Sequence, residues 1–272
     1  MDLLPEKSAT EFGQKIPDYG ITGIPASLKF WLGLPVIVGP GIAAGAILWV
    51  HGDGLVYHFD DYTTAPPTIS RALLHQSIAG PFAIAMIASG IFLTIAVFQV
   101  ALLLNRNLKL LGQDTTWYTA WLFAVLMCET AAIAGMVVLS QFTGNLNPKL
   151  HDIGSYMLFF GHAIGISLAG LLIRGVLIKM NGKEQLPDAA VKSWLALRRF
   201  PRRAGWIAIL SVIYGVVYFG GKFLPDEFFF WQRTVMSVLE VVVILSFLGF
   251  LTAFWPFLRD SKPWNRHQAG DR

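Results

Sequence analysis

The stretch that decides the fold is residues 84–97, which reads IAMIASGIFLTIAV and contains no charged side chain. A strand of a membrane β-barrel would alternate polar and apolar residues in pieces of about ten, and this run shows no such alternation. An α-helix satisfies all of its own backbone hydrogen bonds and is the other structure that can cross a hydrocarbon layer. The stretch therefore predicts a membrane-spanning helix.

Similar apolar runs fill most of the 272-residue chain, in which 54% of residues are hydrophobic and only 14% are charged. Soluble domains carry about 25% charged residues. Six runs approach or exceed the roughly 20 residues that a bilayer requires: 30–50, 72–104, 117–140, 153–177, 205–219 and 231–257. The sequence thus predicts an all-α polytopic membrane protein, with a six-helix domain over 30–258 between polar tails at 1–29 and 259–272.

Most of the basic residues lie in loops and tails between the apolar runs. Of the 21 Lys and Arg, 17 fall on the side that holds the two tails and the long fourth connection. The positive-inside rule then predicts that both termini are cytoplasmic. Because the basic residues lie in loops and tails and not on a folded surface, the net charge of +4 does not indicate a nucleic-acid partner, and we expect none.

Small residues in the first run suggest how it packs. Gly41 and Gly45 are four residues apart, a spacing that lets a neighbouring helix approach closely. Pro40 and Pro81 predict kinks in the first two spanning helices. The lone cysteine, Cys128, excludes an intramolecular disulfide and a cysteine-based metal site.

Ionisable side chains within apolar runs are the strongest functional signal in a membrane protein, because an unpaired charge there costs several kcal/mol. Glu129, His162 and Glu240 each lie about 8 to 11 residues from the outer end of their predicted helix. At 1.5 Å per residue, this predicts one polar layer roughly 12–16 Å deep. The layer is either a general acid/base site or a structural lock of hydrogen bonds between three helices.

A second polar group lies at the predicted outer ends of the helices. His75 begins the second run, and His151 and Asp152 precede the fourth. Imidazole and carboxylate groups can serve acid/base chemistry or bind zinc, but no tight metal-binding motif is present. His75 and His162 differ by about 10 Å or more in depth, so they cannot both be axial ligands of one haem iron. We predict no metal and no cofactor.

Several short stretches, in order, resemble the Frag/DRAM/Sfk family of six-helix membrane proteins. This family includes the Golgi factor that remodels glycosylphosphatidylinositol (GPI) anchors and the N-terminal part of a cell-wall biogenesis protein. The resembling stretches are APPTIS at 65–70, CET at 128–130, HDIG at 151–154, GH at 161–162, VLE at 238–240 and AFW at 253–255. The resemblance implies lipid-related work and favours one site made by Glu129, His162 and Glu240.

These observations together predict an integral membrane protein that acts on, or organises, membrane lipids from the outer side. Its lipid headgroup would meet Ser70, His75, His151 and Asp152, while the three intramembrane residues line the buried end of the site. For an enzyme, acyl transfer or deacylation would use His162 or His151 as the base. Two alternatives remain: a non-catalytic subunit of a larger membrane assembly, and a proton-coupled transporter with helices interrupted near the intramembrane prolines.

Overall fold

The computed structural model describes most of the chain between residues 31 and 259. The described residues are 31, 33–57, 67–110, 116–180, 197–225 and 228–259. The tail predicted at 1–29 lies outside them, as does the tail at 259–272 apart from its first residue.

All regular structure in the described part of the chain is helical. The helices are α2 (Pro35–Tyr57), α3 (Ile69–Ala72), α4 (Gln76–Leu110), α5 (Thr116–Gln141), α6 (Pro148–Met180), η2 (Leu197–Arg199), α8 (Phe200–Gly220), η3 (Gly221–Phe223), α9 (Phe229–Thr252) and α10 (Trp255–Arg259). Six of the helical segments are long and apolar enough to span a membrane. This confirms the six spanning helices predicted from the sequence.

Three helices differ from what the sequence suggested. The fifth span was expected at 205–219, but α8 already begins at Phe200, where Pro201 occupies the first turn. Proline is tolerated there because the amide of that position has no partner within the helix. In addition, α2 and α4 continue through Pro40 and Pro81. Both helices are therefore uninterrupted at these prolines.

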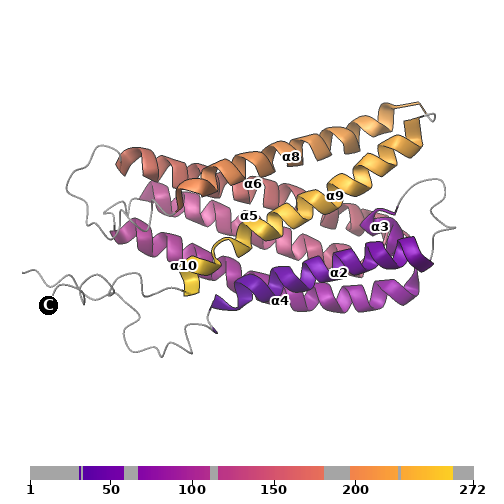
Figure 1. The fold of residues 1–272 in the computed structure, drawn as a ribbon, viewed down its shortest axis with the longest axis horizontal. Coiled ribbons are helices and arrows are strands. Elements are labelled where there is room, and N and C mark those ends of the chain that lie inside the picture. The colour runs from indigo at the N-terminus through magenta and orange to yellow at the C-terminus, as the bar shows by residue number, and fades with distance from the viewer. Residues whose placement is uncertain are drawn as a thin grey trace, which may run out of the picture.

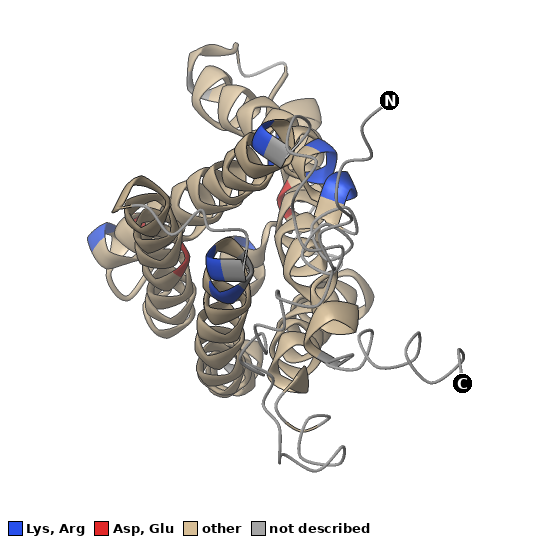
Figure 2. Ribbon diagram, turned by 90° about the vertical axis from the view of Figure 1, so that its left-hand side faces the viewer, with Lys and Arg blue, Asp and Glu red and all other residues tan. Residues whose placement is uncertain are grey.

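The long helices pack in a closed ring (Figures 1 and 2). Each contacts its neighbour in chain order, from α2 through α4, α5, α6 and α8 to α9, and α9 returns to contact α2. Because α6 and α9 also touch across the ring, side chains from helices far apart in sequence meet inside the bundle.

The outward faces of the helices are as apolar as the interior. On α4, Ile84, Ile91 and Leu102 are 59–71% exposed, whereas Met86 and Leu93 are only 1% exposed. A helix that is hydrophobic on both its packed and its exposed faces belongs in a lipid environment. The protein is an integral membrane protein.

The packing face of α2 is not the one that the sequence suggested. Gly41 and Gly45 are exposed and would place an added Cβ at least 4 Å from any neighbouring atom, whereas a Cβ on Gly39 would lie 2.9 Å from the amide nitrogen of Leu93. Ser89 Oγ also donates a hydrogen bond of 2.8 Å to the Gly39 carbonyl. Two residues turn a helix by about 200°, so Gly39 and Gly41 face opposite sides. The prediction that Gly41 and Gly45 pack against a helix was wrong.

The most extensive contact between two helices is that of α5 with α6, and glycines make it possible. A Cβ on Gly135 would lie 2.6 Å from the Leu158 amide nitrogen, and one on Gly154 would lie 2.7 Å from that of Leu139. A Cβ on Gly161 would meet the Cys128 carbonyl oxygen at 2.8 Å. The backbones of α5 and α6 therefore touch along several turns, which brings their polar side chains together.

Candidate functional site

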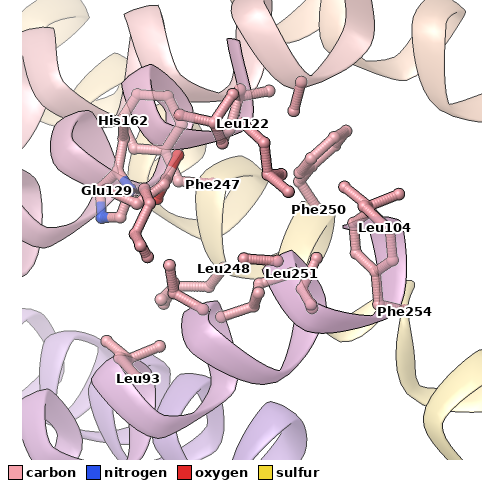
Figure 3. Close-up of a pocket in the computed structure, with 17 residues that line it drawn as sticks. Leu93, Leu104, Leu122, Glu129, His162, Phe247, Leu248, Phe250, Leu251 and Phe254 are labelled. Carbon is pink, nitrogen blue, oxygen red and sulfur yellow. Dashed lines mark hydrogen bonds and ion pairs between the residues drawn. The ribbon is translucent and has the colours of Figure 1, made fainter. Parts of the chain in front are cut away.

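Two of the predicted intramembrane residues form a direct pair. His162 Nδ1 on α6 lies 2.7 Å from Glu129 Oε2 on α5, and the two side chains are only 8% and 13% exposed. Figure 3 shows the imidazole and the carboxylate side by side. The structure thus brings Glu129 and His162 together in the middle of their helices.

The pair lies at the boundary between two apolar clusters of the core. One turn away on α5, Val125 belongs to one cluster and Ile133 to the other. The same holds on α6 for Ile166 and Leu158. Apolar layers lie on both sides of the pair. The contact between the carboxylate and the imidazole therefore offsets the loss of hydration of each group, because a lone charge at this depth would be strongly unfavourable.

Gly165 provides the space that the carboxylate occupies. A Cβ at this position would lie 2.5 Å from Glu129 Oε1. Gly165 is three residues after His162, so both lie on the face of α6 that meets α5. The motif Gly161-His162-x-x-Gly165 therefore supplies the polar partner and the clearance for the pair, and its spacing was readable from the sequence.

A narrow cavity begins at this pair. Seventeen residues of α4, α5, α6, α9 and the segment after α9 line it, and all are apolar except Glu129 and His162. From the pair, the lining runs through Leu122 and Phe250 to Leu104 and Phe254. The volume is about 40 Å³, so the cavity holds a few water-sized groups and a lipid chain requires its side chains to move apart.

Glu240, the third predicted member of the layer, makes a different contact. Its Oε2 accepts a hydrogen bond of 3.0 Å from the Ile69 amide, and the residue is 5% exposed. One turn earlier on α9, Ser237 Oγ donates a hydrogen bond of 2.5 Å to the Pro67 carbonyl. These two side chains satisfy backbone groups of a short buried segment, as a non-helical segment at membrane depth requires.

The predicted layer of three residues therefore divides into two levels. On α9 it is Phe247 whose ring contacts that of His162, with centroids 5.1 Å apart. Glu240 is seven residues from Phe247, or about 10 Å toward the N-terminal end of α9, and it does not line the cavity. The prediction that Glu129, His162 and Glu240 lie at equal depth assumed that their three helices end at a common level. The position of α9 along the bundle does not satisfy this assumption.

The residues predicted to meet a headgroup lie near the start of α6 and around α3. His151 Nε2 is 2.8 Å from Ser70 Oγ, and His151 Nδ1 is 2.8 Å from the Phe142 carbonyl oxygen. Asp152 follows on the exposed side of α6, and His75 is half-buried in the turn between α3 and α4. The structure brings Ser70 and His151 together across 81 positions of the chain.

Sequence reasoning missed several partners in these contacts. The Phe142 carbonyl gave no signal, because any residue has a backbone oxygen. Ser237 could have been found, since it lies three residues before Glu240 on one helix face. Gly165 could also have been found, since it lies three residues after His162 on one face of the same helix.

The described residues contain no group of three or more His, Cys, Asp or Glu side chains placed to hold a metal ion. Residues 31–260 match the family model described as the Frag1/DRAM/Sfk1/Cwh43P N-terminal domain. Neither the curated proteins nor the solved structures gave a match to the chain.

Proposed function

The chain belongs to the Frag1/DRAM/Sfk1/Cwh43P N-terminal domain family, and from this premise we propose that it acts on, or organises, membrane lipids through a site reached from the outer side. The site comprises the Glu129–His162 pair, the cavity beneath it and the polar groups around Ser70 and His151. Membrane lipids are its ligands under this proposal.

The proposed orientation has both termini in the cytoplasm. Figure 2 views the bundle from the end where α2 begins and α10 ends, and Lys and Arg gather on that end. Residues such as Arg106, Lys179 and Arg203 are among them by their positions at the helix ends. The positive-inside rule assigns this end to the cytoplasm, so Ser70 and His151 lie at the outer end.

The observation that carries the proposal is the cavity with one polar end. It starts at Glu129 and His162 and is apolar from there toward the cytoplasmic end. A lipid has the same polarity, with a polar group followed by an aliphatic chain. An acyl chain in the cavity would displace the Leu, Val and Phe side chains of the lining, and the lipid would run past the pair toward its headgroup contacts around Ser70 and His151.

Each predicted residue has a role in this proposal. Glu129 fixes the imidazole of His162 through Nδ1, which leaves Nε2 as the atom that exchanges a proton or a hydrogen bond with the lipid. Glu240 holds the segment that carries Ser70, and His151 contacts Ser70 directly. His75 and Asp152 are the proposed headgroup contacts.

Lipid retention tests the proposal. Val125 lines the cavity, and Val125→Trp should fill it and reduce the lipid that copurifies with the protein, as measured by native mass spectrometry. The neighbouring Phe123 is 61% exposed, so Phe123→Trp is a matched control that should leave bound lipid unchanged. Equal lipid retention in both variants would contradict the proposal, and a stoichiometric partner protein in mild detergent would favour the accessory-subunit alternative.

A further inference from the structure

The contacts of His151 define which of its nitrogens carries a proton. The Phe142 carbonyl oxygen can only accept, so the Nδ1–H donates to it. In the neutral ring, Nε2 is then an acceptor, and the Ser70 hydroxyl donates to it over 2.8 Å. A serine hydroxyl that donates to an imidazole nitrogen is the arrangement of an activated nucleophile and its base.

Ser70 is held in this arrangement from both sides. Before it, the Pro67 carbonyl accepts from Ser237 and the Ile69 amide donates to Glu240. After it, the Arg71 amide donates to Thr68 at the start of α3. The serine therefore sits on a segment fixed to α9, while its base comes from α6, and this orientation does not depend on a ligand.

The pair also lies at the level where a lipid ester is found. His151 is in the first turn of α6 and is 7% exposed, whereas Ser70 is partly exposed. His162, which lines the cavity, is 11 residues further along the helix, or about 16 Å deeper. Hydrocarbon occupies the central 30 Å or so of a bilayer and the polar region begins at its edge, so Ser70 lies near the boundary.

We propose that Ser70 is a nucleophile that accepts an acyl group from a membrane lipid ester, with His151 as its base. Ser70 Oγ attacks the ester carbonyl carbon while Nε2 of His151 takes the hydroxyl proton. The bond to the lipid alcohol breaks, and that oxygen leaves with the proton from Nε2. A second alcohol, or water, then gives its proton to Nε2 and attacks the acyl carbon; the bond to Ser70 Oγ breaks, and Nε2 returns the proton to Oγ, which restores the Ser70 hydroxyl.

The third partner of this pair is a backbone carbonyl. In Ser-His-Asp enzymes a carboxylate holds the imidazole and stabilises its charged form. The Phe142 carbonyl fixes the tautomer in the same way but brings no negative charge. We therefore expect acylation to be slower than in an enzyme with the complete triad.

Covalent labelling of the full-length protein tests this inference, which rests on the proposed function only for the identity of the ester as a lipid. A fluorophosphonate with a long alkyl chain should modify the detergent-solubilised wild-type protein, and peptide mass spectrometry should place the adduct on Ser70. The His151→Gln variant should be labelled about 100-fold more slowly, because general-base assistance contributes at least that factor.

Ser167 on α6 provides the control, since its hydroxyl donates only to its own helix at the Ala163 carbonyl. Ser167→Ala should be labelled at the wild-type rate. An unmodified Ser70 peptide in folded wild-type protein, or equal labelling rates with and without His151, would overturn the inference. If Ser70 is labelled but the cavity variants retain lipid normally, the nucleophile stands and the proposed lipid cavity fails; the reverse outcome leaves lipid binding and removes the nucleophile.

Discussion

Gly165 lies against the carboxylate of Glu129, so closely that a Cβ on this glycine would come within 2.5 Å of Glu129 Oε1. The Glu129–His162 pair therefore depends on a residue that has no side chain. This relationship links helix packing to the polar site, because the glycine that admits the carboxylate lies on the same face of α6 as the histidine.

Replacing this glycine should disrupt the pair. We expect Gly165→Ala to displace the Glu129 carboxylate and to lower the free energy of unfolding by about 1–3 kcal/mol, as overpacking usually does. Gly175→Ala on the same helix meets no atom within 4 Å and should be neutral or slightly stabilising. Thermal unfolding in detergent compares the two, and equal melting temperatures would contradict the packing described for Gly165.

The pair itself should behave as a coupled unit. Glu129→Leu or His162→Leu alone leaves one buried polar partner uncompensated, and each should cost about 3–5 kcal/mol. The double variant should cost clearly less than the sum of the two. A double-mutant cycle in denaturant measures this coupling, and strictly additive losses would mean that the two side chains do not interact.

The packing face of α2 can be tested by two glycines of one helix. Gly39→Ala should destabilise the protein, because the new methyl group would press on the α4 backbone at Leu93. Gly41→Ala has open space and should stabilise the helix by about 0.5–1 kcal/mol. If Gly41→Ala is the more damaging substitution, the helix is rotated relative to the structure.

The structural role of Glu240 can be tested by hydrogen exchange at the Ile69 amide. Glu240→Ala removes the acceptor of the Ile69 amide, and a lost hydrogen bond of this kind is equivalent to about 1–3 kcal/mol. Since each 1.4 kcal/mol is a factor of ten, hydrogen exchange at Ile69 should become about 10- to 100-fold faster. Glu240→Gln keeps an acceptor oxygen, so the Ile69 amide of this variant should exchange near the wild-type rate. An unchanged exchange rate at Ile69 in Glu240→Ala would show that the contact does not hold the segment.

The sequence predicted those features that depend on composition along a single helix. Long apolar runs sufficed for the six spanning helices, and equal distances from the helix ends suggested that Glu129 and His162 would meet. Both lie in the middle of adjacent helices whose backbones touch. The assumption that the helix ends lie at a common level is therefore adequate for this pair.

Features that depend on how separate segments fold together were not predictable in this way. Gly39 and Gly41 are both small residues in one apolar run, and only the rotation of α2 against α4 selects between them. Glu240 has its partner in the short segment at Ile69, whose position results from non-local packing. The hydrogen bond between Ser70 and His151 likewise requires three elements to meet.

Photo-crosslinking can show whether an acyl chain occupies the cavity that begins at Glu129 and His162. Full-length protein is reconstituted with a phospholipid that carries a photoactivatable group along its acyl chain, and the crosslinked peptides are mapped by mass spectrometry. We expect adducts on cavity residues such as Leu122 and Leu251, and their loss in Val125→Trp. Adducts confined to exposed residues such as Phe123, unchanged by that substitution, would contradict this expectation.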